Sequence, residues 1–469
     1  YNLANVGTLN GIPFFTDAGG GSMYTHNVSA TQSTAERNTA YGFLSLDAIT
    51  TGDDNVAMGL GAGTAINTGA SNVIIGSAAG DALTSGGFNV AIGKSALSTE
   101  DAHGKNVAIG YAALETQDAG ADAFNIAVGF NAGNAVTTGA NNIVIGGGAM
   151  GGAGNKTGGN NIAIGRDSGS LMTSANTNVL IGDYTGDAML TSDSNVAIGY
   201  QALSTETDGD QNVAIGFRAL RALNQDGDGY NVAIGSDAGY SMTTGSQNTI
   251  VGANSGFKIL DATRNTVLGD FAFYNNTTGD DNIAIGSNSL HNANGAGSTK
   301  NIAIGSSAGN QISSGTKNIL IGYSAGDGIN VGDDNVAIGD AALSAIGAGN
   351  KSVAIGSNAL TLQSTTFTEG GGVYNNDPTI THTADARIVA GLRVTGTGIP
   401  ANATIASITD STHFELSVST TGGSKTETLT FFGGQDANNT AVGYFAGNSV
   451  TSGVENTLVG AGAGDTINT

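Results

Sequence analysis

Hydrophobic residues recur along this chain in a short phrase close to Asn-Val-Ala-Ile-Gly, in which three apolar positions lie between an amide and a glycine. Successive copies are 17 or 19 residues apart, except for one interval of 87 residues. The 21 copies begin at positions 38, 55, 72, 89, 106, 125, 142, 161, 178, 195, 212, 231, 248, 265, 282, 301, 318, 335, 352, 439 and 456, and only Ser352 is not Asn. A short fixed period of this kind indicates one structural unit that is stacked many times.

Each copy predicts a short β-strand followed by a return path. In residues 195–211, the run Val196-Ala197-Ile198 has strand-forming residue types. Alternate side chains of a strand point to opposite faces, so the second and fourth positions share one face and the third position points to the other. The third position is apolar in every copy. A strand with one wet face would alternate apolar and polar residues, so we expect both faces to be covered. One face would lie inside the coil, and the other would lie against another copy of the chain.

The residues around the strand predict anchors and turns. Asn tolerates left-handed backbone angles and bonds to neighbouring backbone, and stacked Asn side chains can bond to the coils above and below. The glycine that ends the phrase allows a turn and a close backbone approach. An Ala followed by Leu or Gly, as in Ala202-Leu203, begins the return path. We predict structural anchors at Asn55, Asn72, Asn89, Asn125, Asn195, Asn265 and Asn335.

The spacing divides the chain into four segments. Residues 1–37 are expected to form an irregular N-terminal junction, 38–362 a β-roll, 363–436 an inserted β-sandwich-like module, and 437–469 the continued β-roll. The chain begins without Met and stops fourteen residues into a repeat, so we expect a piece of a longer protein. Strands within the insertion are predicted at 388–394, 404–409, 413–418 and 426–432.

The insertion is the segment in which we expect a receptor site. Insertions into repeat proteins emerge on one face, which is often the binding face. This segment is rich in aromatic residues and histidine compared with the repeats. Candidate receptor-binding residues are Tyr374, His382, Phe414 and Phe431. A spacer without any ligand is the alternative.

Composition narrows the class of partner. The chain has 15 Lys and Arg against 38 Asp and Glu, for a net charge of -23. Such a chain is a poor match for nucleic acid or for anionic membrane surfaces, and we expect neither as a partner. No apolar run approaches the ~20 residues that span a bilayer, so no membrane insertion is expected in this piece. Cys is absent, and Gly accounts for 76 of 469 residues without a Gly-X-Y period, which excludes collagen.

Three kinds of site chemistry were weighed against this background, and no cofactor is expected. Calcium is the strongest candidate, because aspartate pairs before the anchors could stack, at Asp53/Asp54, Asp208/Asp210, Asp226/Asp228, Asp280/Asp281 and Asp333/Asp334. Solvated turn carboxylates are the alternative. The run 154–157, Gly-Asn-Lys-Thr, is a poor match for a phosphate-binding loop. The histidines at 26, 103, 291, 382 and 413 are scattered and follow no repeat position, so we expect no enzyme.

The phrase Asn-x-Ala-Ile-Gly-x-x-Ala resembles the head repeats of YadA-like trimeric autotransporter adhesins. The resemblance covers 38–469 apart from the insertion, and the coils here are longer than is typical of those heads. It implies an all-β fold, a left-handed parallel β-roll (β-solenoid) of about 21 coils, assembled as a homotrimer. The spacing is also similar to repeats in bacteriophage tail and capsid fibres. The inserted run from Val394 to Pro400 and on to Ser417 resembles a small β module of phage structural proteins.

These resemblances imply a structural fibre that attaches a virion to its host, with a bacterial trimeric adhesin head as the alternative. The partners implied are a host cell-surface glycan or protein receptor and other virion proteins. The location implied is extracellular, on the virion surface or alternatively on the bacterial outer surface. A polysaccharide depolymerase built on a β-solenoid is a further alternative, because acid pairs could lie within the turns.

Overall fold

The computed structural model describes residues 4–9, 12–16, 21–25, 34–293, 298–344, 349–363, 366–385, 387–401, 403–432, 436–450 and 453–465. These residues form strands, turns and bends, and no helix occurs among them. The chain divides into two compact units, Tyr1–Gly229 and Tyr230–Thr469. Each unit contains a parallel β-solenoid whose coils repeat about every 17 residues. The predicted all-β solenoid is therefore confirmed.

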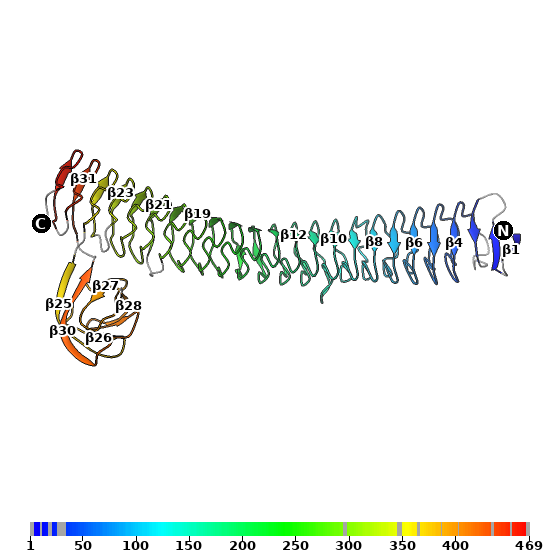
Figure 1. Ribbon diagram of the computed structural model, residues 1–469. Coiled ribbons are helices and arrows are strands. Elements are labelled where there is room, and N and C mark those ends of the chain that lie inside the picture. The colour runs from blue at the N-terminus through cyan, green and yellow to red at the C-terminus, as the bar shows by residue number, and fades with distance from the viewer. Residues whose placement is uncertain are drawn as a thin grey trace. The chain divides into compact units, whose positions relative to one another are not determined.

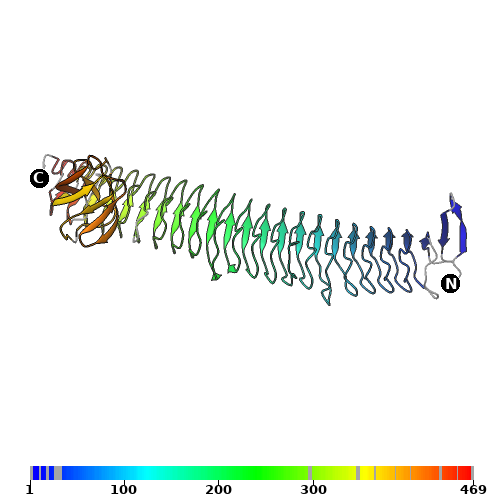
Figure 2. The ribbon, with the colours of Figure 1, turned by 90° about the horizontal axis from the view of Figure 1, so that it is seen from below.

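The solenoid of the N-terminal unit is a ladder of three-residue strands in which each strand pairs in register with the next (Figures 1 and 2). Its strands are β4 (Thr39–Tyr41), β5 (Val56–Met58), β6 (Val73–Ile75), β7 (Val90–Ile92), β8 (Val107–Ile109), β9 (Ile126–Val128), β10 (Ile143–Ile145), β11 (Ile162–Ile164), β12 (Val179–Ile181), β13 (Val196–Ile198) and β15 (Val213–Ile215). Two short strands on the outer turns, β14 (Gly209–Asp210) and β16 (Gly227–Asp228), pair in parallel with each other.

Strands also form before the first anchor, where the sequence predicts irregular structure. β1 (Ala4–Leu9) and β2 (Ile12–Thr16) are antiparallel, and β2 pairs in the same sense with β3 (Met23–Tyr24). β3 then pairs in parallel with β4, so the ladder begins one rung ahead of Asn38. Ser22 occupies the place of an anchor, because its Oγ accepts the Asn38 backbone N–H at 3.0 Å. Residues 26–33 of the predicted junction, which include His26, lie outside the described residues.

The C-terminal unit holds a second ladder and one sheet of a different kind. The ladder strands are β17 (Val232–Ile234), β18 (Thr249–Val251), β19 (Thr266–Leu268), β20 (Ile283–Ile285), β21 (Ile302–Ile304), β22 (Ile319–Ile321), β23 (Val336–Ile338), β24 (Val353–Ile355), β31 (Thr440–Val442) and β32 (Thr457–Val459). β24 pairs directly with β31 although 87 residues separate their anchors. The chain thus leaves the ladder after β24 and returns to its next rung.

Between these two rungs the chain forms a six-stranded antiparallel sheet in the order β27-β30-β25-β26-β29-β28 (Figure 1). Its strands are β25 (Thr366–Asn375), β26 (Thr379–Thr381), β27 (Arg393–Thr395), β28 (Ile405–Asp410), β29 (His413–Leu416) and β30 (Ser424–Phe432). Three predicted strands correspond to β28, β29 and β30. The strand predicted at 388–394 is wrong for most of its length. β25 was missed because three consecutive glycines lower its strand propensity, and its register shifts at that point.

The interior of each coil is filled from its third, ninth and twelfth residues, counted from the anchor. Third-position side chains are buried throughout both ladders up to β31. Where the ninth residue is Gly, the twelfth is a large aliphatic, and a Cβ on Gly80 would lie 2.9 Å from Leu83 Cδ1. Where the ninth is Leu, the twelfth is often polar or small, as in Leu97 with Glu100. The two positions therefore share one volume, as close packing requires.

The anchor asparagines form a buried hydrogen-bonded ladder. Asn55 Oδ1 accepts both the backbone N–H and the side-chain Nδ2 of Asn72 at 3.0 Å, and Asn72 Nδ2 also donates to the Gly86 carbonyl at 2.9 Å. The left-handed residue is the one before each anchor rather than the Asn itself, as at Ser71 with φ 60°. All seven predicted anchors are buried, namely Asn55, Asn72, Asn89, Asn125, Asn195, Asn265 and Asn335. Their side chains complete a backbone ladder that would otherwise leave buried N–H groups unpaired.

Candidate functional site

The outward face of the short strands is a candidate interaction surface in each unit. The second and fourth positions of a strand point away from the interior, whereas the third is fully buried, as in β10 and β19. In the N-terminal unit, 21 of the 22 outward positions of β4–β13 and β15 are hydrophobic, with Thr39 the exception. Most of these side chains are half-buried, and the more exposed ones include Met58 at 43%, Ile145 at 38% and Leu268 at 47%. The sequence predicted two covered faces, and this chain by itself covers one of them.

Aromatic residues extend this face along one edge in the N-terminal unit. The residue after the strand-ending glycine is Tyr111 in one coil and Phe130 in the next, and their rings stack with centroids 5.1 Å apart. Tyr200 and Phe217 repeat the arrangement at 5.5 Å. All four rings are exposed by 41% or more. An exposed apolar surface of this extent marks an interaction site in a soluble protein.

Three of the four predicted receptor-binding residues lie in the core of the six-stranded sheet. Tyr374, Phe414 and Phe431 are 2% exposed or less, and the Phe414 and Phe431 rings meet edge to face at 5.9 Å. His382 is 6% exposed, and its ring packs against Phe414. The sequence correctly marks this segment as aromatic, but these rings hold the sheet together. The rings of Tyr374, Phe414 and Phe431 are closed to a ligand, whereas His382 also lines a cavity of about 480 Å³ beside Asp385 and Asp410. Receptor binding at His382 stays a prediction.

The aspartates before the anchors are bound by the neighbouring coil. Asp53 Oδ1 accepts the Glu36 backbone N–H at 2.7 Å, and Arg37 Nε donates to Asp54 Oδ1 at 2.6 Å. This hydrogen bond holds the pKa of Asp54 below its usual value. The same contacts recur for Asp280 with Thr263, Asp281 with Arg264, and Asp333 with Thr316. These carboxylates therefore extend the backbone ladder on the outer turns.

The two aspartate pairs at consecutive coils of the N-terminal unit make similar contacts. Asp210 Oδ1 accepts the Asp193 backbone N–H at 2.5 Å, and Asp208 Oδ1 accepts the Thr191 hydroxyl at 2.6 Å. Asp228 Oδ1 accepts the Gln211 side-chain amide at 2.7 Å. Asp210 and Asp228 are brought together by the parallel pairing of β14 with β16. A bound calcium ion remains a prediction.

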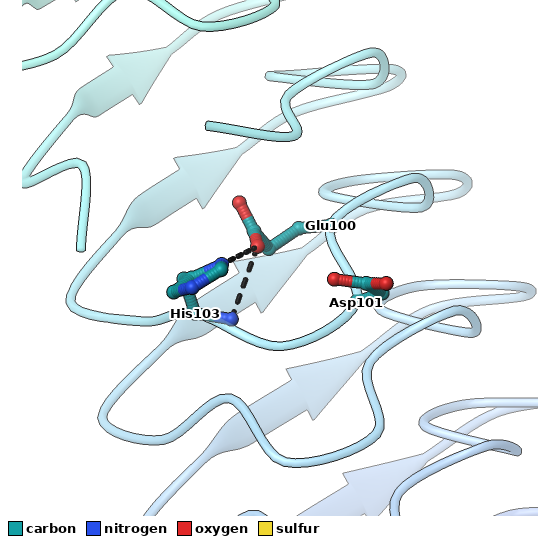
Figure 3. A group of neighbouring side chains, drawn as sticks. All are labelled: Glu100, Asp101 and His103. Carbon is teal, nitrogen blue, oxygen red and sulfur yellow. Dashed lines mark hydrogen bonds and ion pairs between the residues drawn. The ribbon is translucent and has the colours of Figure 1, made fainter. Parts of the chain in front are cut away.

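Glu100, Asp101 and His103 form a separate group on one turn of the N-terminal unit, with ligand atoms within 4.8 Å of one another (Figure 3). Glu100 is fully buried, and its Oε1 accepts the His103 backbone N–H at 3.1 Å and lies 3.5 Å from Nδ1. Burial raises the pKa of the Glu100 carboxyl. Carboxylate and imidazole ligands suit divalent transition metals. Figure 3 shows Glu100 bonded to His103, while Asp101 is exposed and makes no drawn contact with either, so we assign no metal here.

Buried polar residues at the twelfth coil position went unnoticed in the sequence. Glu206 Oε1 accepts backbone N–H groups from three residues of its own turn and from Gln225 of the next coil. Gln117 Nε2 donates to the Thr137 carbonyl at 3.0 Å, and Asn276 Oδ1 accepts the Gly279 N–H at 2.9 Å. Each of these residues lies in a 19-residue coil or in the coil before one. They satisfy backbone groups that the longer coil leaves unpaired.

Lys156 has the same kind of structural role and does not bind phosphate through a Gly-rich loop. Its side chain is fully buried, and Nζ donates to the Met172 carbonyl at 2.7 Å. Burial lowers the pKa of Lys156 to about 8. The ammonium group is therefore directed into the solenoid, where an anion in solvent cannot reach it.

No membrane-spanning helix is found among the described residues. Comparison of the chain with protein-family models, with curated proteins and with solved structures finds no match.

Proposed function

We propose that this chain is a structural fibre protein that assembles as a homotrimer and presents a multivalent binding surface for attachment to a host cell. A left-handed β-roll in a bacteriophage tail or capsid fibre is the form we favour. The observation that carries the proposal is the partly exposed aliphatic face of the strands. A bacterial adhesin head would use the same face, so that alternative stands on the same observation.

The size of this face argues for a second copy of the chain as its occupant. Soluble monomers rarely expose apolar patches larger than a few hundred Å². Complete burial of an aliphatic side chain contributes about 1.5–3 kcal/mol, and most outward side chains are a third exposed or less, so covering each one gives no more than about 0.5 kcal/mol. The 11 strands of the N-terminal unit carry two such positions each, which amounts to on the order of 10 kcal/mol. This gain is comparable to the cost of association, about 4–15 kcal/mol, so covering the face on every copy would offset much of that cost.

The regular spacing of this face also fits identical partners. Its residues repeat in register from rung to rung, as in the pairing of Ile145 with Ile164. A second copy carries the same spacing and can match every rung, which a partner without the repeat cannot do. Three copies around one axis would close the assembly and cover the face on each. Three equivalent sites would then add weak receptor contacts through avidity.

We propose a binding role without catalysis. The carboxylates weighed for a depolymerase are engaged by backbone and side-chain donors of neighbouring coils, as at Asp53 and Asp210. Nothing in their contacts favours the enzymatic alternative. We propose a virion surface as the location and a cell-surface receptor as the partner.

The experiment replaces outward side chains on adjacent rungs. The double variant Ile145→Glu/Ile164→Glu places two charges on the strand face, where the pair is in register. Leu171→Glu is the matched control, because Leu171 is 42% exposed on an outer turn and lies off the strands. We expect the double variant to show a reduced native mass by light scattering with its β-sheet circular dichroism retained. Equal masses for both variants and the parent chain would contradict the assigned face.

A further inference from the structure

The six-stranded sheet is seated on the solenoid of its own unit. Ser314 Oγ donates to the Ala390 carbonyl at 3.3 Å, and Asn330 Nδ2 donates to the Gly391 carbonyl. Val331, from the solenoid, belongs to the same buried cluster as the core of the sheet. Gly391 permits the close approach, because a Cβ there would lie 2.5 Å from Ser313 Oγ. The contact is therefore specific to this pair of surfaces.

A groove runs along this junction. It consists of two cavities of about 600 and 400 Å³, and Ser313 and Thr404 line both. The sheet contributes Ser407, Ile408 and Ser417, and the solenoid contributes Gln311 among others. Ligand pockets of proteins typically have volumes of about 300–1,000 Å³. The groove is therefore large enough for a small ligand.

The lining of the groove combines apolar surface, which predominates in the larger cavity, with hydroxyl and amide groups. Although the chain has a net charge of -23, none of the described residues that line either cavity has an ionisable side chain. Among the described residues, the Thr404 and Ser407 hydroxyls and the Gln311 amide make no hydrogen bond and are open to a ligand. Ile408, 41% exposed, adds an apolar patch beside them.

These properties select among ligand classes. An anion would find no cationic partner, and a cation would find no carboxylate. A wholly apolar ligand would leave hydroxyl and amide groups desolvated without partners, which costs about 1–3 kcal/mol each. A sugar offers hydroxyls that both donate and accept, and its ring carries an apolar C–H face that can pack on Ile408.

We propose that the groove between the solenoid and the six-stranded sheet binds a short neutral saccharide. This inference rests on the proposed function for its biological setting. It adds the chemical class of the receptor, a neutral sugar, and the place on the fibre where that sugar binds. Contacts to the sugar hydroxyls come from both surfaces, through Gln311 on one side and Thr404 and Ser407 on the other. The site consequently depends on the seating of the sheet as well as on the residues themselves.

The test is saturation-transfer difference NMR on the purified full chain. The neutral probes are maltohexaose and chitotetraose, and the charged probe is tetragalacturonate. Ser407→Arg fills the groove with a long cationic side chain. Thr428→Arg places the same side chain at an exposed position of the same sheet that lines neither cavity. Circular dichroism verifies that both variants are folded.

We expect at least one neutral probe to bind and the charged probe to give no signal. Ser407→Arg should weaken the neutral probe about tenfold or more, which corresponds to about 1.4 kcal/mol, and Thr428→Arg should not. The groove assignment is overturned if no neutral probe binds, if tetragalacturonate binds as well, or if Ser407→Arg binds like the parent chain. Native mass separates the two proposals. A trimer that binds no neutral probe overturns the groove alone, and a monomer that binds one overturns only the assembly.

Discussion

Replacing one anchor, Asn265→Ala, tests whether the buried asparagine ladder holds the coils together. Asn265 is 1% exposed, and its Oδ1 accepts the backbone N–H of Asn282 at 2.9 Å. Its Nδ2 donates to Asn248 Oδ1 at 3.1 Å and to the Thr263 carbonyl at 3.2 Å. Orphaning the Asn282 N–H costs about 1–3 kcal/mol, and each lost bond adds about 0.5–1.5 kcal/mol. We expect a loss of about 3–5 kcal/mol, which is a large part of an ordinary stability of about 5–15 kcal/mol.

Two measurements check this expectation. Denaturant unfolding of the variant should report the loss, and hydrogen exchange should report its location. The Asn282 amide should exchange faster by about two orders of magnitude, because solenoid coupling passes mainly between neighbouring coils. Asn275→Ala is the control, since Asn275 is also an asparagine bonded to the next coil but is only partly buried. Equal effects of the two substitutions, with Asn282 still protected, would refute the role given to the ladder.

Three further substitutions probe the interior. Burial raises the pKa of the Glu206 carboxyl, so the native state holds a proton on it that the unfolded state has released. The stability of the parent chain therefore falls as the pH rises through that pKa. Glu206→Gln should melt at a higher temperature than the parent at pH ~7, and the two melting temperatures should converge toward pH ~4. Burial lowers the pKa of Lys156 to about 8, so the native state binds fewer protons than the unfolded state between pH 8 and 10.5. The parent chain therefore gains stability as the pH rises through this window. Lys156→Met should be more stable than the parent to denaturant at pH ~7, by up to about 3 kcal/mol, and this difference should shrink as the pH rises from 8 to 10.5. Gly322→Ala places a Cβ 2.5 Å from the Gly339 carbonyl oxygen of the next coil, at a backbone φ of 136°. We expect it to lower the free energy of unfolding by about 3 kcal/mol or more. In Gly120→Ala the new Cβ meets no atom within 4 Å, so thermal unfolding should show a far smaller loss.

The stacked-strand fold was predictable because its signal is repeated 21 times. What the pattern does not show is which strand face is interior, because Val196, Ala197 and Ile198 are all apolar. The structure decides this through size: the coil is thin, and the third position, mostly Ala, faces its interior. The larger side chains are consequently left outside. The relation between the ninth and twelfth positions was readable in the sequence, but only once the interior register was known.

In the inserted segment, the residue types were visible in the sequence but their structural roles were not. Its aromatic content was visible, yet an aromatic residue that fills a small core cannot be told by type from one that binds a receptor. Phe414 and Phe431 are enclosed because the sheet folds over them, which depends on non-local pairings such as β26 with β29. The groove at Ser313 and Thr404 was equally hidden, because about ninety residues separate its two walls in the chain.

The measurement that tests assembly most directly is the native mass of the intact chain, by light scattering or native mass spectrometry, with and without chelator. We predict three times the chain mass of 46.2 kDa, unchanged when chelator is added. This result would mean that the outward strand face is covered by identical copies without help from a metal ion. A mass of one chain would contradict the homotrimer, and with it the fibre proposal would lose its main physical support.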